Sequence, residues 1–192
     1  MGVRRNTRQG QLRIIGGQWR GRKLLFTATE GLRPTPDRVR ETLFNWLASS
    51  MAGARCLDLF AGSGALGLEA LSRGAKHCTF VDASATSIDN IRQHLDTLAC
   101  QQTQTFKMDA LRWLQQAEDQ VFDIVFLDPP FGQGLLGPSC EQLAGSGLLA
   151  DGAQVYVEAA VEEEEPGIPT GWTLRKDKRA GAVRYRLFVH SD

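Results

Sequence analysis

The alternation of apolar and polar positions divides the chain near residue 53. Beyond this point, short apolar runs alternate with segments in which apolar residues recur at helical spacing. Strands are predicted at 55–60, 77–82, 105–109, 122–128, 154–158, 172–176 and 183–190, with the last two forming a hairpin around Ala180-Gly181. Helices are predicted at 65–72, 84–98, 111–116 and 140–144. This alternation is typical of βαβ units, so we expect an α/β fold with a mostly parallel, doubly wound sheet.

The first 34 residues follow a different pattern. Two short strand-like segments, 12–15 and 22–26, flank Gly16-Gly17 and Gly21, whose turn chemistry predicts a small β-hairpin. A helix should follow, with Thr35 as its N-cap and Pro36 at its first position. Apolar residues then recur at helical spacing as far as residue 47. We therefore expect a basic hairpin extension over residues 1–34 and a larger domain over residues 35–192.

Length and composition indicate an ordinary globular protein. The 192 residues are 42% hydrophobic, enough for one domain with a sizeable core. Because no apolar run reaches about 18 residues and none follows the basic start, neither a membrane span nor a secretory signal is expected. The four cysteines are dispersed without a CxxC pair, and His77, His94 and His190 lack metal-ligand spacing. We therefore expect a cytoplasmic protein that uses no metal.

A strong charge asymmetry underlies the net charge of zero. Residues 1–40 contain ten lysines or arginines and two acids, so the remaining 152 carry twelve basic and twenty acidic residues. A cationic arm on an acidic body indicates a polyanionic partner such as nucleic acid, although a solvated tail has the same composition. Arg38 and Arg40 could equally face solvent or pair with Glu41. The acidic run 162–165 is predicted to be a solvated loop. The basic residues predicted to bind phosphate are Arg20, Arg22, Arg33, Arg38 and Arg40.

A glycine-rich loop follows the first strand of the alternating region. Gly62-x-Gly64-x-x-Gly67 allows a sharp turn and a close approach to a ligand at the N-terminus of the next helix. This motif, with Asp82 at the end of the next strand, fits a dinucleotide and S-adenosylmethionine equally well. Asp58 favours the latter, because a carboxylate before the loop repels a pyrophosphate but attracts the ammonium group of S-adenosylmethionine.

Three further positions complete the predicted cofactor site. Asp109 ends the third strand, where its carboxylate could accept a hydrogen bond from the adenine amino group, and Ala110 follows it. Phe60 lies beside the glycine loop. Each acid could instead only cap the helix after its strand. Three acids at successive strand ends beside one glycine loop favour a ligand site over three independent caps.

The segment 123–131 carries the predicted chemistry. An apolar strand ends in Asp128-Pro129-Pro130-Phe131. The prolines stiffen the loop, and the Asp128 carboxylate and the Pro129 carbonyl can both accept hydrogen bonds from an amino group, aiming its lone pair at a methyl donor. Phe131 can stack on a base that has been flipped out of a helix. Without the upstream glycine loop, the same segment would indicate only a buried strand and a stiff turn.

The glycine loop and the Asp-Pro-Pro-Phe segment together resemble the class I S-adenosylmethionine-dependent amino-methyltransferases. The front end is more specific, since LRIIGGQWRGRKL at 12–24 and GLRPTPDRVRETLFNWL at 31–47 are similar to the bacterial small-subunit ribosomal RNA guanine-N2 methyltransferases. The resemblance runs from about residue 12 to residue 190. Pro36, where relatives often have threonine, and Gly132-Gln133-Gly134, where a basic residue is common, depart from the family pattern.

This resemblance implies a Rossmann-like class I methyltransferase fold, with a seven-stranded, mostly parallel sheet, an antiparallel last strand and an N-terminal β-hairpin that helps to hold RNA. It implies S-adenosylmethionine as cofactor and one guanine of 16S rRNA in an assembling small ribosomal subunit as substrate. By position, Asp58 and the loop glycines would hold the methionine part, Asp82 the ribose and Asp109 the adenine. The segment 128–131 would hold the guanine, with Thr35 joining the arginines in substrate binding. We expect a monomer.

Three alternatives remain open from the sequence. An adenine-N6 methyltransferase acting on DNA or RNA would use the same Asp-Pro-Pro-Phe loop, and the identity of the modified base distinguishes the two activities. A nicotinamide-dependent oxidoreductase would use the same glycine loop, and NAD binding distinguishes it. A non-catalytic RNA-binding assembly factor would tolerate the loss of Asp128.

Overall fold

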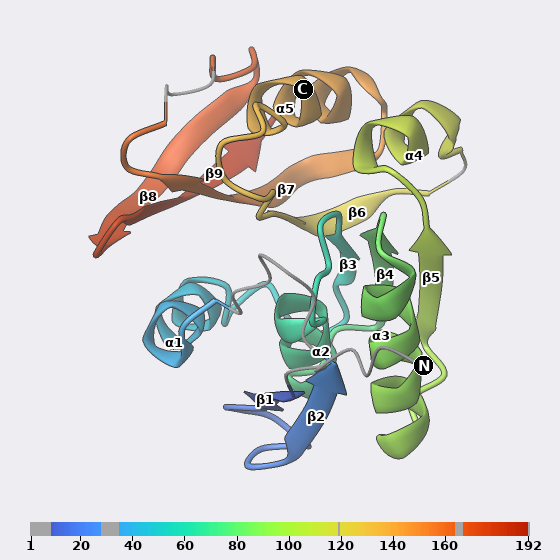
Figure 1. The fold of residues 1–192 in the computed structure, drawn as a ribbon. Helices are drawn as coiled ribbons and strands as arrows, with labels where there is room; N and C mark the ends of the chain where they lie inside the picture. The colour runs from blue at the N-terminus through green and yellow to red at the C-terminus, as the bar shows by residue number, and fades with distance from the viewer. Residues whose placement is uncertain (1–8, 28–34, 119, 164–166, 192) are drawn as a thin grey trace, which may run out of the picture.

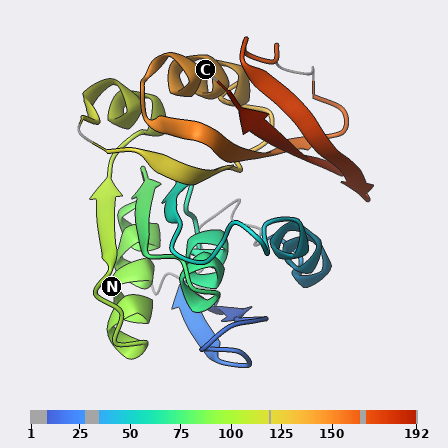
Figure 2. The same cartoon turned by 180° about the vertical axis from the view of Figure 1, so that it is seen from behind.

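The computed structural model describes residues 9–27, 35–118, 120–163 and 167–191, and Figure 1 and Figure 2 show its backbone from two sides. Its strands are β1 (Gln9–Arg13), β2 (Lys23–Thr27), β3 (Arg55–Asp58), β4 (His77–Asp82), β5 (Thr103–Lys107), β6 (Phe122–Leu127), β7 (Leu149–Ala160), β8 (Trp172–Ala180) and β9 (Val183–His190). Its helices are α1 (Asp37–Trp46), α2 (Ala65–Ser72), α3 (Ala85–Thr97), α4 (Ala110–Gln116) and α5 (Leu136–Gly145).

Seven of these strands form one sheet in the order β5-β4-β3-β6-β7-β9-β8. The strands from β5 to β7 run parallel, while β9 is inserted between β7 and β8 and runs antiparallel to both. β1 and β2 form a separate antiparallel hairpin. The winding reverses between β3 and β6, which is where open α/β sheets bind ligands. The predicted fold, with its antiparallel last strand and N-terminal hairpin, is confirmed.

Both faces of the sheet are covered. One apolar cluster joins α1, α2, α3 and the hairpin to one face, and a second joins α4 and α5 to the other. Successive strand residues alternate between the clusters, as Phe126 and Leu127 do on β6. All eight residues of α2 are buried, which explains why this helix is apolar around most of its circumference.

The start of α1 differs from the prediction. Pro36 is the N-cap and Asp37 is the first helical residue, and the cap forms no side-chain hydrogen bond. The Thr35 hydroxyl instead donates to Asp128, a residue distant in sequence. The predicted Thr35 cap is therefore wrong, because a tertiary partner takes the hydroxyl that capping would use.

Three elements are longer than predicted. α5 spans ten residues instead of the five at 140–144, since Gly137 and Pro138 fall in its first turn, where proline is tolerated. Strands β7 and β8 have twelve and nine residues. β7 pairs with β6 at Leu149 and with β9 over residues 154–160, and β8 pairs with β9 along nearly its whole length; these hydrogen bonds between strands leave no periodic signal in the sequence.

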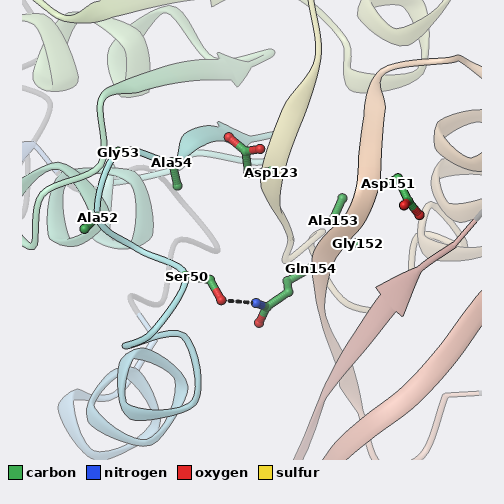
Figure 3. A pocket seen from close by; sticks show the side chains of 9 residues that line it. All are labelled: Ser50, Ala52, Gly53, Ala54, Asp123, Asp151, Gly152, Ala153 and Gln154. Carbon is green, nitrogen blue, oxygen red and sulfur yellow. Dashed lines mark hydrogen bonds between the residues drawn. The ribbon is translucent and has the colours of Figure 1, made fainter.

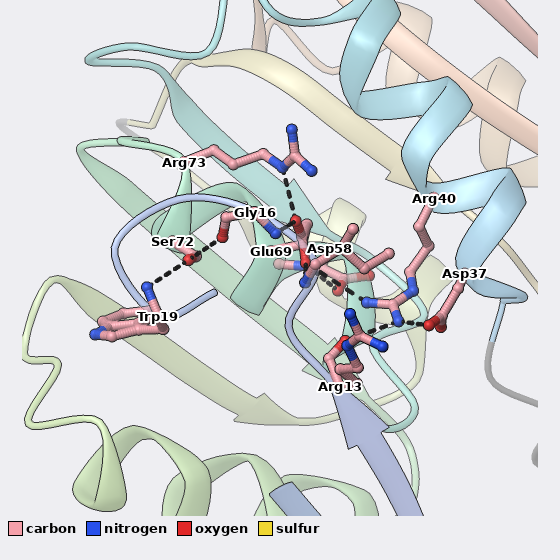
Figure 4. A network of polar contacts seen from close by, with 11 residues as sticks. Arg13, Gly16, Trp19, Asp37, Arg40, Asp58, Glu69, Ser72 and Arg73 are labelled. Atoms are coloured by element: carbon pink, nitrogen blue, oxygen red, sulfur yellow. Dashed lines mark hydrogen bonds and ion pairs between the residues drawn. The ribbon is translucent and has the colours of Figure 1, made fainter. Parts of the chain in front are cut away.

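A buried glutamate ties the hairpin to α2. Glu69 has no exposed surface and accepts hydrogen bonds from the backbone N–H groups of Ile15 and Gly16, both at 2.8 Å. The Ser72 hydroxyl donates to the Gly16 carbonyl at 2.6 Å. Figure 4 shows how these contacts converge beside α2. The C-terminal half of α2 therefore holds the hairpin, while its N-terminus continues from the glycine loop.

Two arginines complete this network. The Arg73 Nε donates to Glu69 at 2.7 Å, and Arg40, which is 1% exposed, lies 3.6 Å from the same carboxylate. Arg40 also donates to Asp37 at 2.7 Å and to the Arg13 carbonyl at 2.9 Å. The prediction that Arg40 binds RNA is therefore wrong, because its guanidinium is enclosed among protein partners and cannot reach a phosphate.

The turn of the hairpin points away from the carboxyl edge of the sheet. Arg22 donates to the Thr97 carbonyl at the C-terminus of α3, whereas Thr27 exchanges two hydrogen bonds with Asn90 in the middle of that helix. The 13 residues of α3 rise about 20 Å, so the turn lies roughly a helix length from that edge. The predicted boundary between residues 34 and 35 stays a prediction, since residues 28–34 lie outside the described ranges.

Candidate active site

The carboxyl edge of the parallel strands brings the predicted acids together. Asp58 ends β3, Asp82 ends β4 and Asp128 directly follows β6. Because β4, β3 and β6 are neighbours, these three carboxylates share one edge of the sheet. Asp109 follows β5 at the same edge. The topology therefore places the strand-end acids at one edge of the sheet, and their binding of a cofactor stays a prediction.

Asp58 is a buried carboxylate that lacks a cationic partner within the described chain. It is 2% exposed, and its Oδ2 accepts a hydrogen bond from the Gly67 N–H at 2.9 Å. Burial, against the opposing Gly67 hydrogen bond and together with the charges of Asp128 and Asp82, raises the pKa of Asp58 to about 7. A ligand cation beside Asp58 would favour its ionised form.

The loop between β3 and α2 has the backbone geometry that its glycines predicted. Gly64 caps α2 with a φ of +78°, a conformation that residues with side chains rarely adopt. Gly67 lies in the first turn of α2, where a Cβ atom would collide with the Phe80 ring on β4. Glycine at these positions therefore permits both the sharp turn and the close packing of α2 on the sheet.

The carboxylates of Asp82 and Asp109 organise the backbone around them. Asp82 accepts hydrogen bonds from the N–H groups of Gly62 and Ser84, each at 2.8 Å. Asp109 is the N-cap of α4 and accepts from the Arg112 N–H at 3.0 Å. The capping alternative is therefore realised at Asp109, whereas α3 is capped by Ser84 and Asp82 instead holds the backbone of the two loops beside it. Since carboxylate oxygens each offer a further lone pair, capping and ligand binding are compatible.

Asp128 stands at the start of the Pro-Pro loop. It is half-buried, and its Oδ2 accepts a hydrogen bond from Thr35 Oγ1 at 3.1 Å. Burial raises the pKa of Asp128 to about 6, and the Thr35 hydrogen bond opposes the rise. Pro129 is buried, whereas Phe131 is 44% exposed. The loop thus presents a mostly ionised carboxylate and an accessible aromatic ring, which suits a planar ligand with an amino group.

A further acid at this edge was missed by sequence reasoning. Glu158 on β7 is 4% exposed, and its Oε2 accepts the Tyr156 hydroxyl at 2.6 Å. Burial and the charge of Asp128, opposed by the Tyr156 hydrogen bond, together raise the pKa of Glu158 to about 8. Its signal in the sequence was a lone glutamate near the carboxyl end of an apolar strand, outside any recognised motif.

The loop after β7 also contacts the loop at 128–134, which we call the catalytic loop after its predicted role. The Glu163 carboxylate accepts hydrogen bonds from the backbone N–H groups of Gly132 and Ala160. The predicted solvated loop at 162–165 is therefore wrong for Glu163, because two backbone donors hold its side chain. Glu162 is exposed as predicted, and residues 164 and 165 lie outside the described chain.

A hollow of about 310 Å³ lies at the opposite edge of the sheet, away from these acids. Figure 3 shows it from close by, with the Gln154 side chain donating a hydrogen bond to the Ser50 hydroxyl. Asp123, on its wall, accepts from the Arg55 N–H at 2.7 Å. None of the predicted site residues lines this hollow, so we assign it no part in the chemistry.

Other chemistry finds little support in the described residues. Among them, no group of histidine, cysteine or acidic side chains is arranged to hold a metal ion, and no helix is long and apolar enough to cross a membrane. Burial raises the pKa of Cys140 to about 12 and that of Cys56 higher still. Both thiols therefore stay protonated and are poor nucleophiles.

Known proteins that are similar to this chain match it over almost its whole length. A family model described as Conserved hypothetical protein 95 matches residues 12–189. Ribosomal RNA small subunit methyltransferase D from Escherichia coli (strain K12) is 50% identical, over 93% of this chain and 90% of that protein. The protein of the same name from Haemophilus influenzae is 47% identical over 94% of each. This chain belongs to the ribosomal RNA small subunit methyltransferase D family.

A solved structure supports the methyltransferase D assignment at the level of the fold. A methyltransferase from Escherichia coli matches with a TM-score of 0.86 and 46% identity, covering 95% of this chain and 99% of that one. Almost the whole length of both chains is aligned in this match. The class I methyltransferase fold is therefore established from both sequence and structure.

S-adenosylmethionine is the predicted cofactor of this methyltransferase D family member. The structure fits it, because the buried Asp58 carboxylate has a raised pKa that a ligand cation would lower. The same carboxylate would repel a pyrophosphate, which argues against the nicotinamide alternative. The individual cofactor contacts remain predictions; they concern Asp58, Phe60, Gly62, Gly64, Asp82, Asp109 and Ala110.

The methyltransferase D structure separates the predicted RNA-binding residues into two places. Arg38 is exposed on the first turn of α1, three residues after Thr35 and hence close to the catalytic loop. Arg20 and Arg22 are exposed at the hairpin turn, roughly a helix length from the carboxyl edge. Arg33 lies outside the described residues. An RNA bound to both places must therefore extend well beyond the target base.

Proposed function

We propose that this protein transfers a methyl group from S-adenosylmethionine to the exocyclic N2 amino group of one guanine in 16S rRNA. The observation that carries the proposal is the Asp128 carboxylate and the Pro129 carbonyl at the carboxyl edge, beside the acids of the cofactor site. Relatives named ribosomal RNA small subunit methyltransferase D support small-subunit rRNA as substrate. The resemblance of residues 12–47 to guanine-N2 methyltransferases supports guanine as the target base.

The chain contributes positioning and charge complementarity. The second carboxylate oxygen of Asp128 and the Pro129 carbonyl would each accept one N–H of the amino group, which turns the nitrogen lone pair out of the base plane. The Thr35 hydroxyl fixes the orientation of the carboxylate by occupying Oδ2. Phe131, which is exposed, can stack on the base and exclude water from one side.

Bound S-adenosylmethionine supplies an electrophilic methyl group on a positively charged sulfur. Transfer of that methyl group to the guanine nitrogen, with the thioether as leaving group, would oblige the nitrogen to give up one proton. Asp128 is ionised in most molecules at neutral pH and is placed to receive that proton or to pass it to solvent. Its negative charge also stabilises the positive charge that develops on the nitrogen.

The deciding experiment is methyl transfer from labelled S-adenosylmethionine to 30S particles assembled from unmethylated rRNA, followed by nucleoside analysis. We expect labelled N2-methylguanosine in the small-subunit RNA. Transfer to adenine alone would replace this proposal with the adenine-N6 alternative, which uses the same four-residue loop. Absence of transfer to any RNA, with cofactor binding demonstrated, would favour a non-catalytic assembly factor.

Three finer expectations concern the setting of the reaction. We propose that the substrate is an assembling small subunit rather than naked RNA, that the protein acts as a monomer, and that it works in the cytoplasm. The separation of the two predicted RNA contacts supports the first, since a folded particle offers phosphates at both distances. Comparing naked 16S rRNA with partly assembled particles in the same assay tests it directly.

A further inference from the structure

Glu158 is placed beside Asp128 by the register of the sheet. Leu127 pairs with Val157 across β6 and β7, so Asp128 and Glu158 follow on adjacent parallel strands about 4.8 Å apart. Side chains alternate between the faces of a sheet, and Phe126 and Tyr156, two residues earlier, belong to the same apolar cluster. The two carboxylates therefore project from the same face.

Each carboxylate is held by one hydroxyl group. Thr35 donates to Oδ2 of Asp128, and the Tyr156 hydroxyl donates to Oε2 of Glu158. Within the described chain, neither Oδ1 of Asp128 nor Oε1 of Glu158 has a hydrogen-bond partner. Neither of these oxygens is among the unpaired polar atoms that are fully buried, so each keeps some accessible surface. The structure thus offers two carboxylates on adjacent strands, each oriented by one hydroxyl group and each with one oxygen that no hydrogen bond of the described chain occupies.

The bases differ in what they present to such a pair of acceptors. Guanine carries two adjacent donors on its Watson–Crick edge, the N1–H and the exocyclic N2 amino group. Adenine carries an amino group at C6 beside an N1 that accepts. Because a carboxylate only accepts hydrogen bonds, two neighbouring carboxylates match guanine and leave the N1 lone pair of adenine facing a negative charge.

We propose that Glu158 is a specificity-determining residue whose Oε1 accepts the N1–H of the target guanine while Asp128 receives the N2 amino group. This inference rests on the proposed guanine-N2 activity and adds the residue that selects guanine. A site built around a donor on the substrate rejects an analogue without it, because the buried carboxylate is then left unpaired. Hydrogen bonding at N1 also places the amino group in a fixed plane relative to Asp128.

The ionisation of Glu158 is consistent with this role. The groups that face it are Asp128 on β6, Tyr156 on its own strand and Tyr185 on β9, with Trp46 of α1 stacked over Tyr185. Burial and the Asp128 charge raise the pKa of Glu158 to about 8 in the free protein. Glu158 must lose its proton to accept from N1–H, whereas the protonated acid would donate to an accepting N1, so the preference for guanine should be greatest above pH 8. An N1–H donor and a nearby sulfonium both favour loss of that proton, so binding of guanine should release it.

The test compares two bases at one position of the substrate. Once the modified guanine has been mapped, 30S particles are reconstituted with either guanine or 2-aminopurine there; 2-aminopurine keeps the 2-amino group but has an accepting N1. We expect the parent protein to prefer guanine in kcat/KM by about 100-fold or more. In Glu158→Gln, the amide oxygen can still accept from Tyr156 while its NH₂ donates to N1. The preference for guanine should therefore fall at least tenfold.

Matched measurements separate specificity from folding. The variant Tyr156→Phe keeps the carboxylate but loses the hydroxyl that orients it, so it should retain the guanine preference at a lower rate. The Kd for S-adenosylmethionine and the Tm are measured for both variants, and we expect both values to stay near those of the parent. Rates that fall equally on both bases in Glu158→Gln would reduce Glu158 to a structural residue and overturn the inference.

The parent protein provides a test that needs no variant. Equal rates on guanine and 2-aminopurine would overturn the role of Glu158 even if Glu158→Gln fails to fold. Failure of the parent to form N2-methylguanosine at all would instead overturn the proposed function. The two failures are therefore distinguishable in the same set of particles.

Discussion

At the scale of single residues, the role proposed for Asp128 depends on the one carboxylate oxygen that Thr35 leaves unoccupied. Replacing it with alanine removes the acceptor that orients the amino group while leaving the acids of the cofactor site in place. We expect kcat to fall by about 100-fold or more, with little change in the Kd for S-adenosylmethionine. Asp123→Asn, at the opposite end of β6, is the matched control and should methylate at the parent rate. Parent-like turnover in Asp128→Ala would remove Asp128 from the mechanism.

Asp58 makes cofactor binding dependent on pH. Its pKa of about 7 in the free protein means that the carboxylate must lose a proton to meet a cation. A bound cation lowers that pKa, so affinity for S-adenosylmethionine should rise as pH increases from 5.5 to about 7.5 and then level off. Calorimetry across this range measures it. In Asp58→Asn we expect about tenfold weaker binding and a flatter curve, because the titration of the ligand's own amino group remains.

Asp58 should also make the stability of the fold depend on pH, in the direction opposite to that of cofactor affinity. The folded-state pKa of Asp58 lies above its unfolded value, so the native protein holds the extra proton and stability is lost as pH rises through about 7. Asp58→Asn removes a buried charge and keeps an oxygen to accept from Gly67. We therefore expect a higher Tm for Asp58→Asn than for the parent at pH 8, and a smaller difference at pH 5. Identical Tm differences at both pH values would contradict the raised pKa.

At the scale of elements, the attachment of the hairpin to α2 depends on the charge of Glu69. Neutralising it leaves the enclosed Arg40 guanidinium without its buried counter-ion and weakens the two backbone hydrogen bonds. We expect Glu69→Gln to lower the free energy of unfolding by about 3–5 kcal/mol, measured by urea denaturation. Asp89→Asn, which breaks an exposed ion pair with Arg92, should cost under about 1 kcal/mol. A similar cost for both variants would mean that burial does not strengthen the Glu69 network.

The elements that could be predicted from the sequence are those with a local pattern. The observed range of α2 is the predicted one, because its apolar run is bounded by Gly64 and Arg73. The observed range of β4 is also the predicted one, because an acid ends its apolar run. β7 and β8 were underestimated, since the length of β7 is set by pairing with β6 and β9 and that of β8 by pairing with β9. The Thr35 cap failed for a similar reason, because its partner, Asp128, lies directly after β6 and is distant in sequence.

The candidate site followed a similar rule. The acids that belong to motifs, such as Asp58 and Asp128, could be placed at one edge of the sheet because each stands at the carboxyl end of a predicted parallel strand. Glu158 could not, because its significance depends on lying next to β6, and strand neighbours are a property of the fold. Arg40 was misjudged because an arginine on a basic segment gives no sign of a buried glutamate 29 positions later.

At the scale of the whole molecule, the basic hairpin turn should contribute long-range attraction to RNA. We expect affinity for 30S particles to fall with increasing salt, and Arg20→Gln/Arg22→Gln to reduce the slope of log Kd against log salt by roughly two units. Filter binding at several salt concentrations measures this slope. Arg112→Gln, an exposed arginine on α4 across the sheet from the hairpin, should leave the slope unchanged. An unaltered slope in the double variant would mean that the turn does not bind phosphate.

The buried helix α2 has a consequence for the order of events during turnover. Its first residue follows the loop that is predicted to bind the cofactor, and its last turn, about 12 Å away for eight residues, holds the hairpin. A ligand that stabilises the position of one end favours the position that the other end requires. Thermodynamic reciprocity then makes RNA and cofactor raise each other's affinity by one common factor. Loss of the positive charge after methyl transfer would lower the affinity for the cofactor product and, through this coupling, the affinity for RNA. The cofactor product and the modified particle would therefore dissociate together.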